Sequence, residues 1–145
     1  MENRYLYKAK RIDDGELVQG YYVKGSDMYG KETHVIFEPD AIFYSHGETD
    51  GLAEIDPSTI CQCTGLADKN GKLIWENDIV NCITTDCEEY ARKIVYDKEE
   101  LDFKATNGKE DYGSEFEYLS CLVEIEVTGN VFDNPELFEG KNHAD

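Results

Sequence analysis

The chain has 145 residues, 40% of them hydrophobic and 12% aromatic, which is enough apolar surface for one packed domain or two small lobes. Asp and Glu number 32 against 14 Lys and Arg, so the formal net charge is −18. This excess disfavours direct binding to nucleic acid, because cation–phosphate contacts supply most of that affinity. Solubility explains the acidity most simply, and a charge pattern that attracts basic partners is the functional alternative.

The sequence contains neither a membrane span nor a secretory signal. No apolar run approaches the roughly 20 residues that cross a bilayer. The N-terminal segment, MENRYLYKAKRIDD, has basic residues without an apolar stretch after them. We therefore expect a cytoplasmic protein that makes no contact with a membrane.

Short strands are predicted from the N-terminus onward. Asp13-Asp14-Gly15 separates YLYKAKRI from ELVQGYYVKG, which predicts a hairpin. Two further strands are expected at 34–38 and 41–45, interrupted by Pro39, because proline cannot donate a ladder hydrogen bond. The polar, Gly-rich run 46–58 predicts a loop. Residues 1–59 are thus expected to form an N-terminal β subdomain.

A second set of strands is predicted from residue 60. Asn70-Gly71 suits both positive-φ positions of a tight turn between 60–66 and the strand that starts at Leu73. A kink is expected at Asn77. In 101–106 apolar and polar residues alternate, which predicts a half-buried strand with Lys104 on its polar face.

The C-terminal segment predicts one more strand and a helical turn. Val123, Ile125 and Val127 share one face, and a two-residue turn is expected at Gly129-Asn130. Asn134-Pro135 has the signature of a helix start, with Asn as the cap and Pro in the first turn. Gly140 is expected to end that helical turn. Residues 141–145 are then expected to be a disordered tail.

Four blocks of the sequence resemble the YopX family. They are TGLADKNGKLIWENDIV (64–80), EVTGNVFDNPELFEG (126–140), KRIDDGELVQGYYV (10–23) and EIDPSTICQCTGL (54–66). The chain departs from the family pattern at Asn77, where Gly is usual, and at Cys63, where an aromatic residue is more common. Because Asn tolerates a positive φ better than other side chains, the kink should be preserved.

The resemblance implies a mainly β fold, a small Src-homology-type barrel over residues 60–140 with additional N-terminal hairpin strands. It also implies a phage or prophage origin and a bacterial host cytoplasm. The family's molecular function is undefined, so the resemblance supplies no catalytic or ligand residue. The matching residues are the kinds that fix turns and caps: Thr64, Gly65, Leu66, Asp68, Asn70, Gly71, Asp78, Gly129, Asn134 and Pro135.

The five cysteines are the strongest candidates for chemistry. Their odd number and the absence of a signal sequence favour reduced thiols. Cys61, Cys63, Cys82 and Cys87 offer four thiolates for zinc, with His34 or His46 in reserve. However, the C-x-C pair lies in an apolar strand, where both sulfurs share a face, whereas zinc knuckles favour C-x₂-C. We expect these cysteines to be small buried hydrophobes.

Other catalytic and ligand patterns are weak. Asp68-x-Asn70-Gly71 begins like a calcium loop, but the twelfth position is Ile79 rather than Glu. No nucleophile elbow or phosphate-cradling Gly loop is present. We therefore expect no enzyme, no metal and no cofactor, although scattered loops can still supply catalytic residues.

A protein-binding role is the leading functional hypothesis. Exposed aromatics on small barrels often bind extended peptides, and Trp75, Tyr90 and Tyr112 are the candidates for such a surface. The expected partner is a host or phage protein, and a homo-oligomer is possible. The alternative is an acidic DNA mimic that occupies the basic groove of a host nucleic-acid-binding protein, with carboxylates at phosphate-like spacing.

Overall fold

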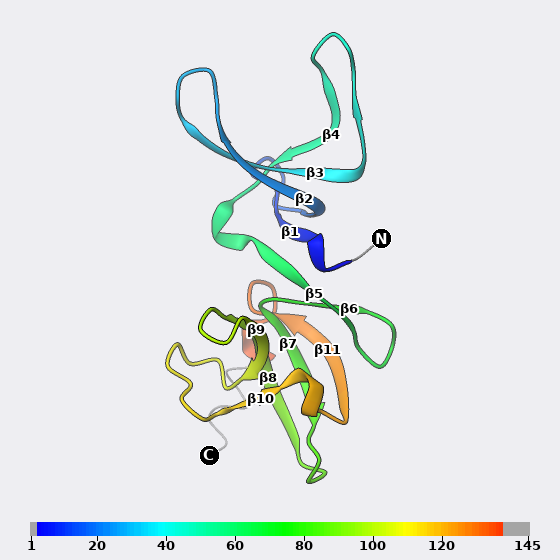
Figure 1. Cartoon of the computed structure of the whole chain (residues 1–145), viewed down its shortest axis with the longest axis vertical. Coiled ribbons are helices and arrows are strands. Elements are labelled where there is room, and N and C mark those ends of the chain that lie inside the picture. Colours follow the sequence, from blue (N-terminus) through cyan, green and yellow to red (C-terminus); the bar gives the residue numbers. More distant parts are fainter. Residues whose placement is uncertain (1–2, 138–145) are drawn as a thin grey trace. The chain divides into compact units, whose positions relative to one another are not determined.

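A computed structural model describes residues 3–137 of the chain, which divides into unit 1 (Met1–Cys63) and unit 2 (Thr64–Asp145). Both units are built from antiparallel strands (Figure 1). Among the described residues, the one α-helical turn is 135–137. Short 3-10 turns lie at Asn3–Tyr5, Pro57–Thr59 and Leu119–Cys121. The mainly β expectation is therefore confirmed, with two sheets. Within residues 3–137, no helix combines the length and the apolar character that a membrane span needs.

Unit 1 is an antiparallel sheet in the order β4-β3-β2-β1-β5. Its strands are β1 (Tyr7–Lys10), β2 (Leu17–Ser26), β3 (Glu32–Phe43), β4 (Thr49–Glu54) and the first residues of β5 (Cys61–Ala67). The β1–β2 hairpin turns at Gly15 with φ 72°, as the sequence predicts. One cluster of side chains fills the core: Ala9, Val18, Ile36, Ala53 and Ile55.

Two expectations for unit 1 are wrong. The strand β3 runs through Pro39 as a single element, and its pairing with β4 is irregular between Phe37 and Ile42. Proline is tolerated there because a bulge removes the need for its missing N–H. The strand β4 lies inside the segment predicted to be a loop. Its Gly51 has φ 86°, so the glycine marks a distortion within a strand rather than the absence of one.

Unit 2 contains a five-stranded sheet in the order β10-β9-β8-β7-β11, curled into a half-barrel (Figure 1). Its strands are β7 (Asp78–Ile83), β8 (Glu89–Asp97), β9 (Asp102–Thr106), β10 (Phe116–Tyr118) and β11 (Glu124–Asn130). The end of β5 and β6 (Leu73–Trp75) form a neighbouring hairpin. Ile74 of this hairpin packs with Val80, Ile94 and Ala105 in the core. The hairpin is therefore anchored to the half-barrel by apolar burial.

The turn between β5 and β6 forms where expected, but its geometry differs. Gly71 has φ 82°, whereas Asn70 does not have a positive φ. Two backbone hydrogen bonds close the turn: Asp68 N donates to Lys72 O at 2.7 Å, and Gly71 N donates to Asp68 O at 3.0 Å. Of Asn70 and Gly71, only Gly71 is left-handed. Asn77 has φ 71°, which confirms the kink predicted between β6 and β7.

Two further expectations for unit 2 are wrong. In β9, Lys104 is only 1% exposed while Leu101 lies on the surface, because carboxylates surround the Lys104 ammonium and satisfy it. Gly129 and Asn130, expected to form a turn, are instead paired with β7 after a bulge between Val127 and Gly129, and the chain turns over 130–134. The expected helix stop at Gly140 and the expected tail at 141–145 lie outside the described residues.

Candidate functional site

The carboxylate of Asp68 fixes the β5–β6 hairpin to β11. Its Oδ1 accepts hydrogen bonds from the backbone amides of Asn70 and Lys72, each at 2.9 Å. Its Oδ2 accepts one from Val127 N at 2.9 Å, and Lys69 N donates to Ile125 O at 3.0 Å. The edge of β11 that does not face β7 is thus partly occupied by the hairpin.

The electrostatics of Asp68 fit this role. Burial alone would raise the pKa of its carboxyl, but the amides of Val127, Lys72 and Asn70 outweigh burial and hold the pKa below its usual value. Asp68 is therefore charged at neutral pH. A buried anion with this many donors binds the two segments with defined geometry.

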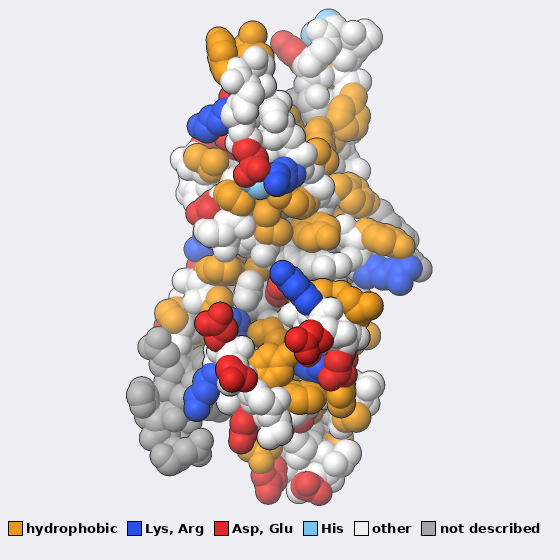
Figure 2. Space-filling model, turned by 60° about the vertical axis from the view of Figure 1, so that its left-hand side comes forward, with side chains coloured by type: hydrophobic (Ala, Val, Ile, Leu, Met, Phe, Trp, Pro, Cys, Tyr) orange, Lys and Arg blue, Asp and Glu red, His pale blue; other side chains and the backbone are white. Residues whose placement is uncertain are grey.

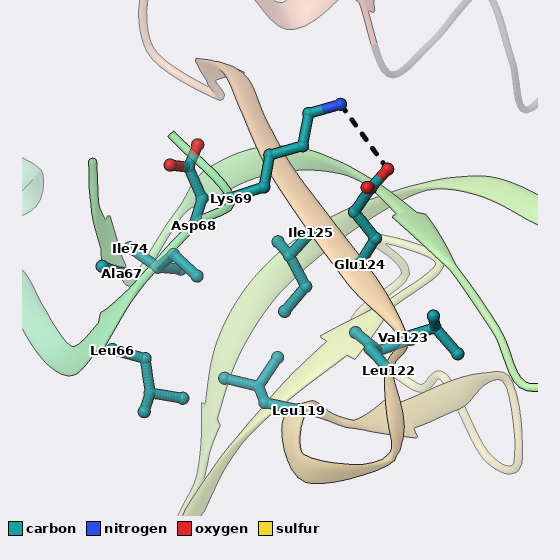
Figure 3. A pocket seen from close by; sticks show the side chains of 10 residues that line it. All are labelled: Leu66, Ala67, Asp68, Lys69, Ile74, Leu119, Leu122, Val123, Glu124 and Ile125. Atoms are coloured by element: carbon teal, nitrogen blue, oxygen red, sulfur yellow. Dashed lines mark ion pairs between the residues drawn. The ribbon is translucent and has the colours of Figure 1, made fainter. Parts of the chain in front are cut away.

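A groove of about 380 Å³ lies beside this junction (Figure 3). One wall is the hairpin, and the other is formed by β11 with the 3-10 turn Leu119–Cys121 before it. The lining side chains are Leu66, Ala67, Asp68, Lys69, Ile74, Leu119, Leu122, Val123, Glu124 and Ile125. We call this space the apolar groove, because most of its lining is aliphatic.

Charge is confined to one end of the apolar groove. Lys69 Nζ lies 3.5 Å from a carboxylate oxygen of Glu124, and in Figure 3 this pair lies on the opposite side of Ile125 from Leu119. Leu66 is 48% exposed and Val123 is 67% exposed, so two aliphatic side chains face solvent at the walls. Exposed aliphatics around a hollow are typical of a binding surface.

A second hollow of about 260 Å³ adjoins the apolar groove and shares Leu66 and Leu119 with it. It adds an aromatic and acidic lining, since its other residues are Thr64, Asp102, Phe103, Tyr118 and Ser120. We call this the second hollow. The two spaces therefore adjoin at Leu66 and Leu119, one with a mainly aliphatic lining and the other with a mixed lining.

The buried ammonium of Lys104 lies in a cage of carboxylates and rings. It pairs with Asp97, with Glu100 at 3.0 Å and with Asp102 at 3.5 Å. It also lies 4.7 Å from the ring centroid of Phe116 and 5.4 Å from that of Tyr118, within cation–π range. The sequence prediction missed this cage. The available signal was a lysine with acidic residues two, four and seven positions before it.

The pKa directions agree with this cage. Burial would lower the pKa of Lys104, but hydrogen bonds to Asp97 and Glu100 raise it above its usual value. The hydrogen bond from Lys104, supported by backbone amides, holds the pKa of Asp97 below its usual range. These groups are charged at neutral pH and neutralise each other in part, which suits a structural ion cluster.

The three aromatic candidates do not form one surface. Trp75 is 5% exposed, so the prediction that it contributes to an exposed surface is wrong, because the residue packs in the interior. Tyr90 is half-buried, with the Arg92 guanidinium 4.6 Å from its ring centroid. Tyr112 is also half-buried and donates to Asp97 at 3.0 Å. None of the three lines the apolar groove or the second hollow.

Most of the remaining signature residues fix local geometry. Thr64 Oγ1 donates to Ile74 O at 2.8 Å, and Asp78 Oδ2 accepts from Trp75 N at 2.8 Å. Gly65 has φ 85°, and Leu66 lines both hollows. Pro135 begins the helical turn.

Gly129 and Asn134 belong to one contact. A Cβ on Gly129 would lie 2.6 Å from Asn134 Oδ1 and 2.9 Å from Asn134 Cβ, so only glycine fits. Asn130 N donates a hydrogen bond to Asn134 Oδ1 at 3.4 Å, and Leu137 N donates one to Asn134 O at 3.1 Å. The pair thus joins β11 to the turn that follows it.

The cysteines lie in two environments. Cys61, Cys63 and Cys82 are buried, and Cys87 and Cys121 are exposed. Cys61 and Cys63 are both buried, as expected for two side chains that point to the same face of a strand. Burial also raises the pKa of Cys82 to about 11, which keeps that thiol protonated and disfavours it as a metal ligand or nucleophile. Across residues 3–137, His, Cys, Asp and Glu side chains form no cluster arranged to hold a metal.

Acidic side chains are dispersed on the face drawn in Figure 2. Asp and Glu there are separated by hydrophobic and uncharged side chains and do not make an unbroken stripe. A mimic of a phosphate backbone needs a regular row of negative charge. This face does not provide one.

Comparison with known proteins identifies relatives by family and by fold. The family model for the YopX protein matches residues 9–139. The crystal structure of YopX from Bacillus subtilis is similar at a TM-score of 0.52 and 18% sequence identity, covering 92% of this chain and 98% of that one. Among curated proteins, none matches the chain by sequence.

Proposed function

The chain belongs to the YopX family, and from that premise we propose that it is a non-enzymatic accessory protein of a phage or prophage. It binds a host or phage protein through the apolar groove of unit 2. The observation that carries this proposal is the groove itself, a concave surface whose walls carry the exposed side chains of Leu66 and Val123.

The fold of unit 2 supports a binding role. We propose that its curled sheet is an open barrel of the Src-homology type, whose β11 edge is partly covered by the β5–β6 hairpin. Small barrels of this type bind extended peptides in surface grooves. Asp68 and the Lys69–Ile125 backbone bond keep the walls in place before a partner arrives, which lowers the entropic cost of binding.

The ionisable groups support a non-enzymatic role. A general acid at neutral pH needs a carboxyl whose pKa is raised. Five carboxyls of the described residues instead have pKa values that hydrogen bonds and ion pairs hold below the usual range: Asp13, Glu32, Asp56, Asp68 and Asp97. These groups stabilise structure as permanent anions.

Site-specific photo-crosslinking in host lysate tests the proposal. A benzophenone amino acid replaces Val123 at the groove, and in a control chain it replaces Met28, which is 88% exposed in unit 1. We expect a protein adduct from position 123 that is absent from position 28 and is lost when Leu66→Glu is added. An adduct formed equally from both positions, or one unaffected by Leu66→Glu, refutes groove binding. An adduct with a second copy of the chain identifies the partner as a homo-oligomer.

A further inference from the structure

We propose that the occupant of the groove is an extended protein segment with two apolar side chains at alternate positions and a Lys or Arg beyond the second. This inference rests on the proposed function and names the chemistry of the partner. It follows from the shape of the paired hollows and from the unequal charge at their ends.

The paired hollows favour an extended segment. The apolar groove and the second hollow meet at the side chains of Leu66 and Leu119, which line both. In an extended chain, residues i and i+2 point the same way and lie about 6.6 Å apart. One apolar side chain of such a segment enters each hollow, while the residue between them points to solvent.

The two ends differ in charge, and this sets the direction of the segment. At the end of the apolar groove, Lys69 and Glu124 pair at 3.5 Å and cancel, and the charge of Asp68 is satisfied by three backbone amides. At the other end, the second hollow contains Asp102, whose neighbours Asp97 and Glu100 share the single ammonium of Lys104 with it. Three carboxylates facing one ammonium leave an excess of negative charge beside the second hollow, in an adjacent hollow of about 500 Å³ that is lined by Asp97, Glu100 and Lys104.

The carboxylates beside the second hollow differ in access. Asp102 Oδ1 is buried and lies 3.5 Å from Lys104 Nζ, so a donor from a partner reaches only the exposed part of the Asp102 side chain. Its side chain remains 35% exposed at the second hollow. Glu100 is also partly exposed and accepts a hydrogen bond from Tyr118 OH at 3.0 Å, which places a ring beside the acidic end. A partner's guanidinium or ammonium would find both carboxylate and ring there.

Selection from a random peptide library displayed on phage tests this inference with the full chain as bait. Four baits are compared: the wild-type chain, the wall variant Leu66→Glu, the double variant Glu100→Gln/Asp102→Asn, and a control double variant. The double variant Glu48→Gln/Asp50→Asn in unit 1 is the matched control, since it changes the net charge equally on exposed side chains. Thermal unfolding of each bait verifies that it is folded.

We expect wild type and the matched control to enrich peptides with apolar residues at i and i+2 and Lys or Arg beyond the second. The Glu100/Asp102 variant should keep the apolar pattern, lose the basic preference and bind an enriched peptide about three- to tenfold more weakly. Apolar peptides without a basic preference would overturn this inference and leave groove binding standing. Enrichment that is equal on Leu66→Glu, or absent from every bait, would overturn both.

Discussion

Removal of the Asp68 carboxylate should separate the β5–β6 hairpin from β11 and destabilise unit 2. Asp68→Ala deletes the acceptor for Asn70 N, Lys72 N and Val127 N, each at 2.9 Å. A hydrogen bond to a charged group contributes about 1.5–3 kcal/mol, and a buried amide left without a partner costs about 1–3 kcal/mol. Because the two local bonds also stabilise the isolated turn, we expect a net loss of about 2–4 kcal/mol.

Unit 1 contains a matched control for this substitution. Asp27 Oδ1 accepts from Tyr29 N and Lys31 N, each at 2.9 Å, in a turn with the same backbone bonds, but it has no bond like that to Val127. Asp27→Ala should therefore cost less than about 1 kcal/mol. The difference between the two variants isolates the long-range contact.

Urea denaturation measures this difference. The single tryptophan, Trp75, is buried in unit 2 and reports its unfolding by fluorescence, while circular dichroism follows both units. The reasoning is refuted if Asp68→Ala lies within about 0.5 kcal/mol of Asp27→Ala, the usual range for surface substitutions.

The remaining predictions concern pH, packing and the Lys104 cage. The folded state lowers the pKa of Asp68, so the charged carboxylate stabilises the fold above its unfolded pKa, and this stabilisation is lost as pH falls through the folded pKa. The difference in free energy of unfolding between wild type and Asp68→Asn should therefore narrow below about pH 4. A Cβ at Gly129 meets Asn134 Oδ1 at 2.6 Å, so Gly129→Ala should cost about 1–3 kcal/mol, and a double-mutant cycle with Asn134→Gly should recover most of it in urea titrations. Lys104→Met leaves its carboxylates facing each other, so its thermal midpoint should fall further below wild type at pH 7 than at pH 4, where those groups begin to protonate; an equal deficit at both pH values would contradict this role.

Local turn chemistry made part of the fold predictable from the sequence. The hairpin at Gly15 and the kink at Asn77 both require positive φ, and Gly and Asn are the residues that adopt it most readily. The prediction of a positive φ at Asn70 is wrong, because the Asp68 carboxylate favours a turn in which only Gly71 is left-handed. Side-chain hydrogen bonds within a turn can thus override dipeptide preference.

Long-range pairing was less predictable. The strand β4 is polar and contains Gly51, so its composition favours a loop, yet hydrogen bonds to β3 hold it in the sheet. Lys104 occupies a polar position in an alternating pattern, and only the folded arrangement of Asp97, Glu100 and Asp102 makes its burial favourable. Tertiary contacts outweighed local preference in both cases.

The groove was the hardest feature to predict, because its walls come from distant parts of the chain. Leu66 stood out as a signature residue, but nothing adjacent in sequence indicates that Leu119 and Ile125 lie across from it. Trp75 appeared the better candidate from residue type alone, since exposed aromatics mark many peptide-binding surfaces. Its burial shifts the candidate surface from aromatic to aliphatic side chains.

The most direct test measures the affinity of the Leu66→Glu chain for the partner crosslinked at position 123. Met28→Glu is the control, because Met28 is also an exposed apolar side chain. Full burial of a leucine side chain contributes about 1.5–3 kcal/mol, and Leu66 is 48% exposed before binding, so covering the rest contributes roughly 1 kcal/mol. Burial of an unpaired glutamate charge adds to this cost, for a loss of roughly tenfold or more in affinity. The account predicts that loss for Leu66→Glu and an unchanged Kd for Met28→Glu. Equal affinities for the two variants would contradict binding through the apolar groove.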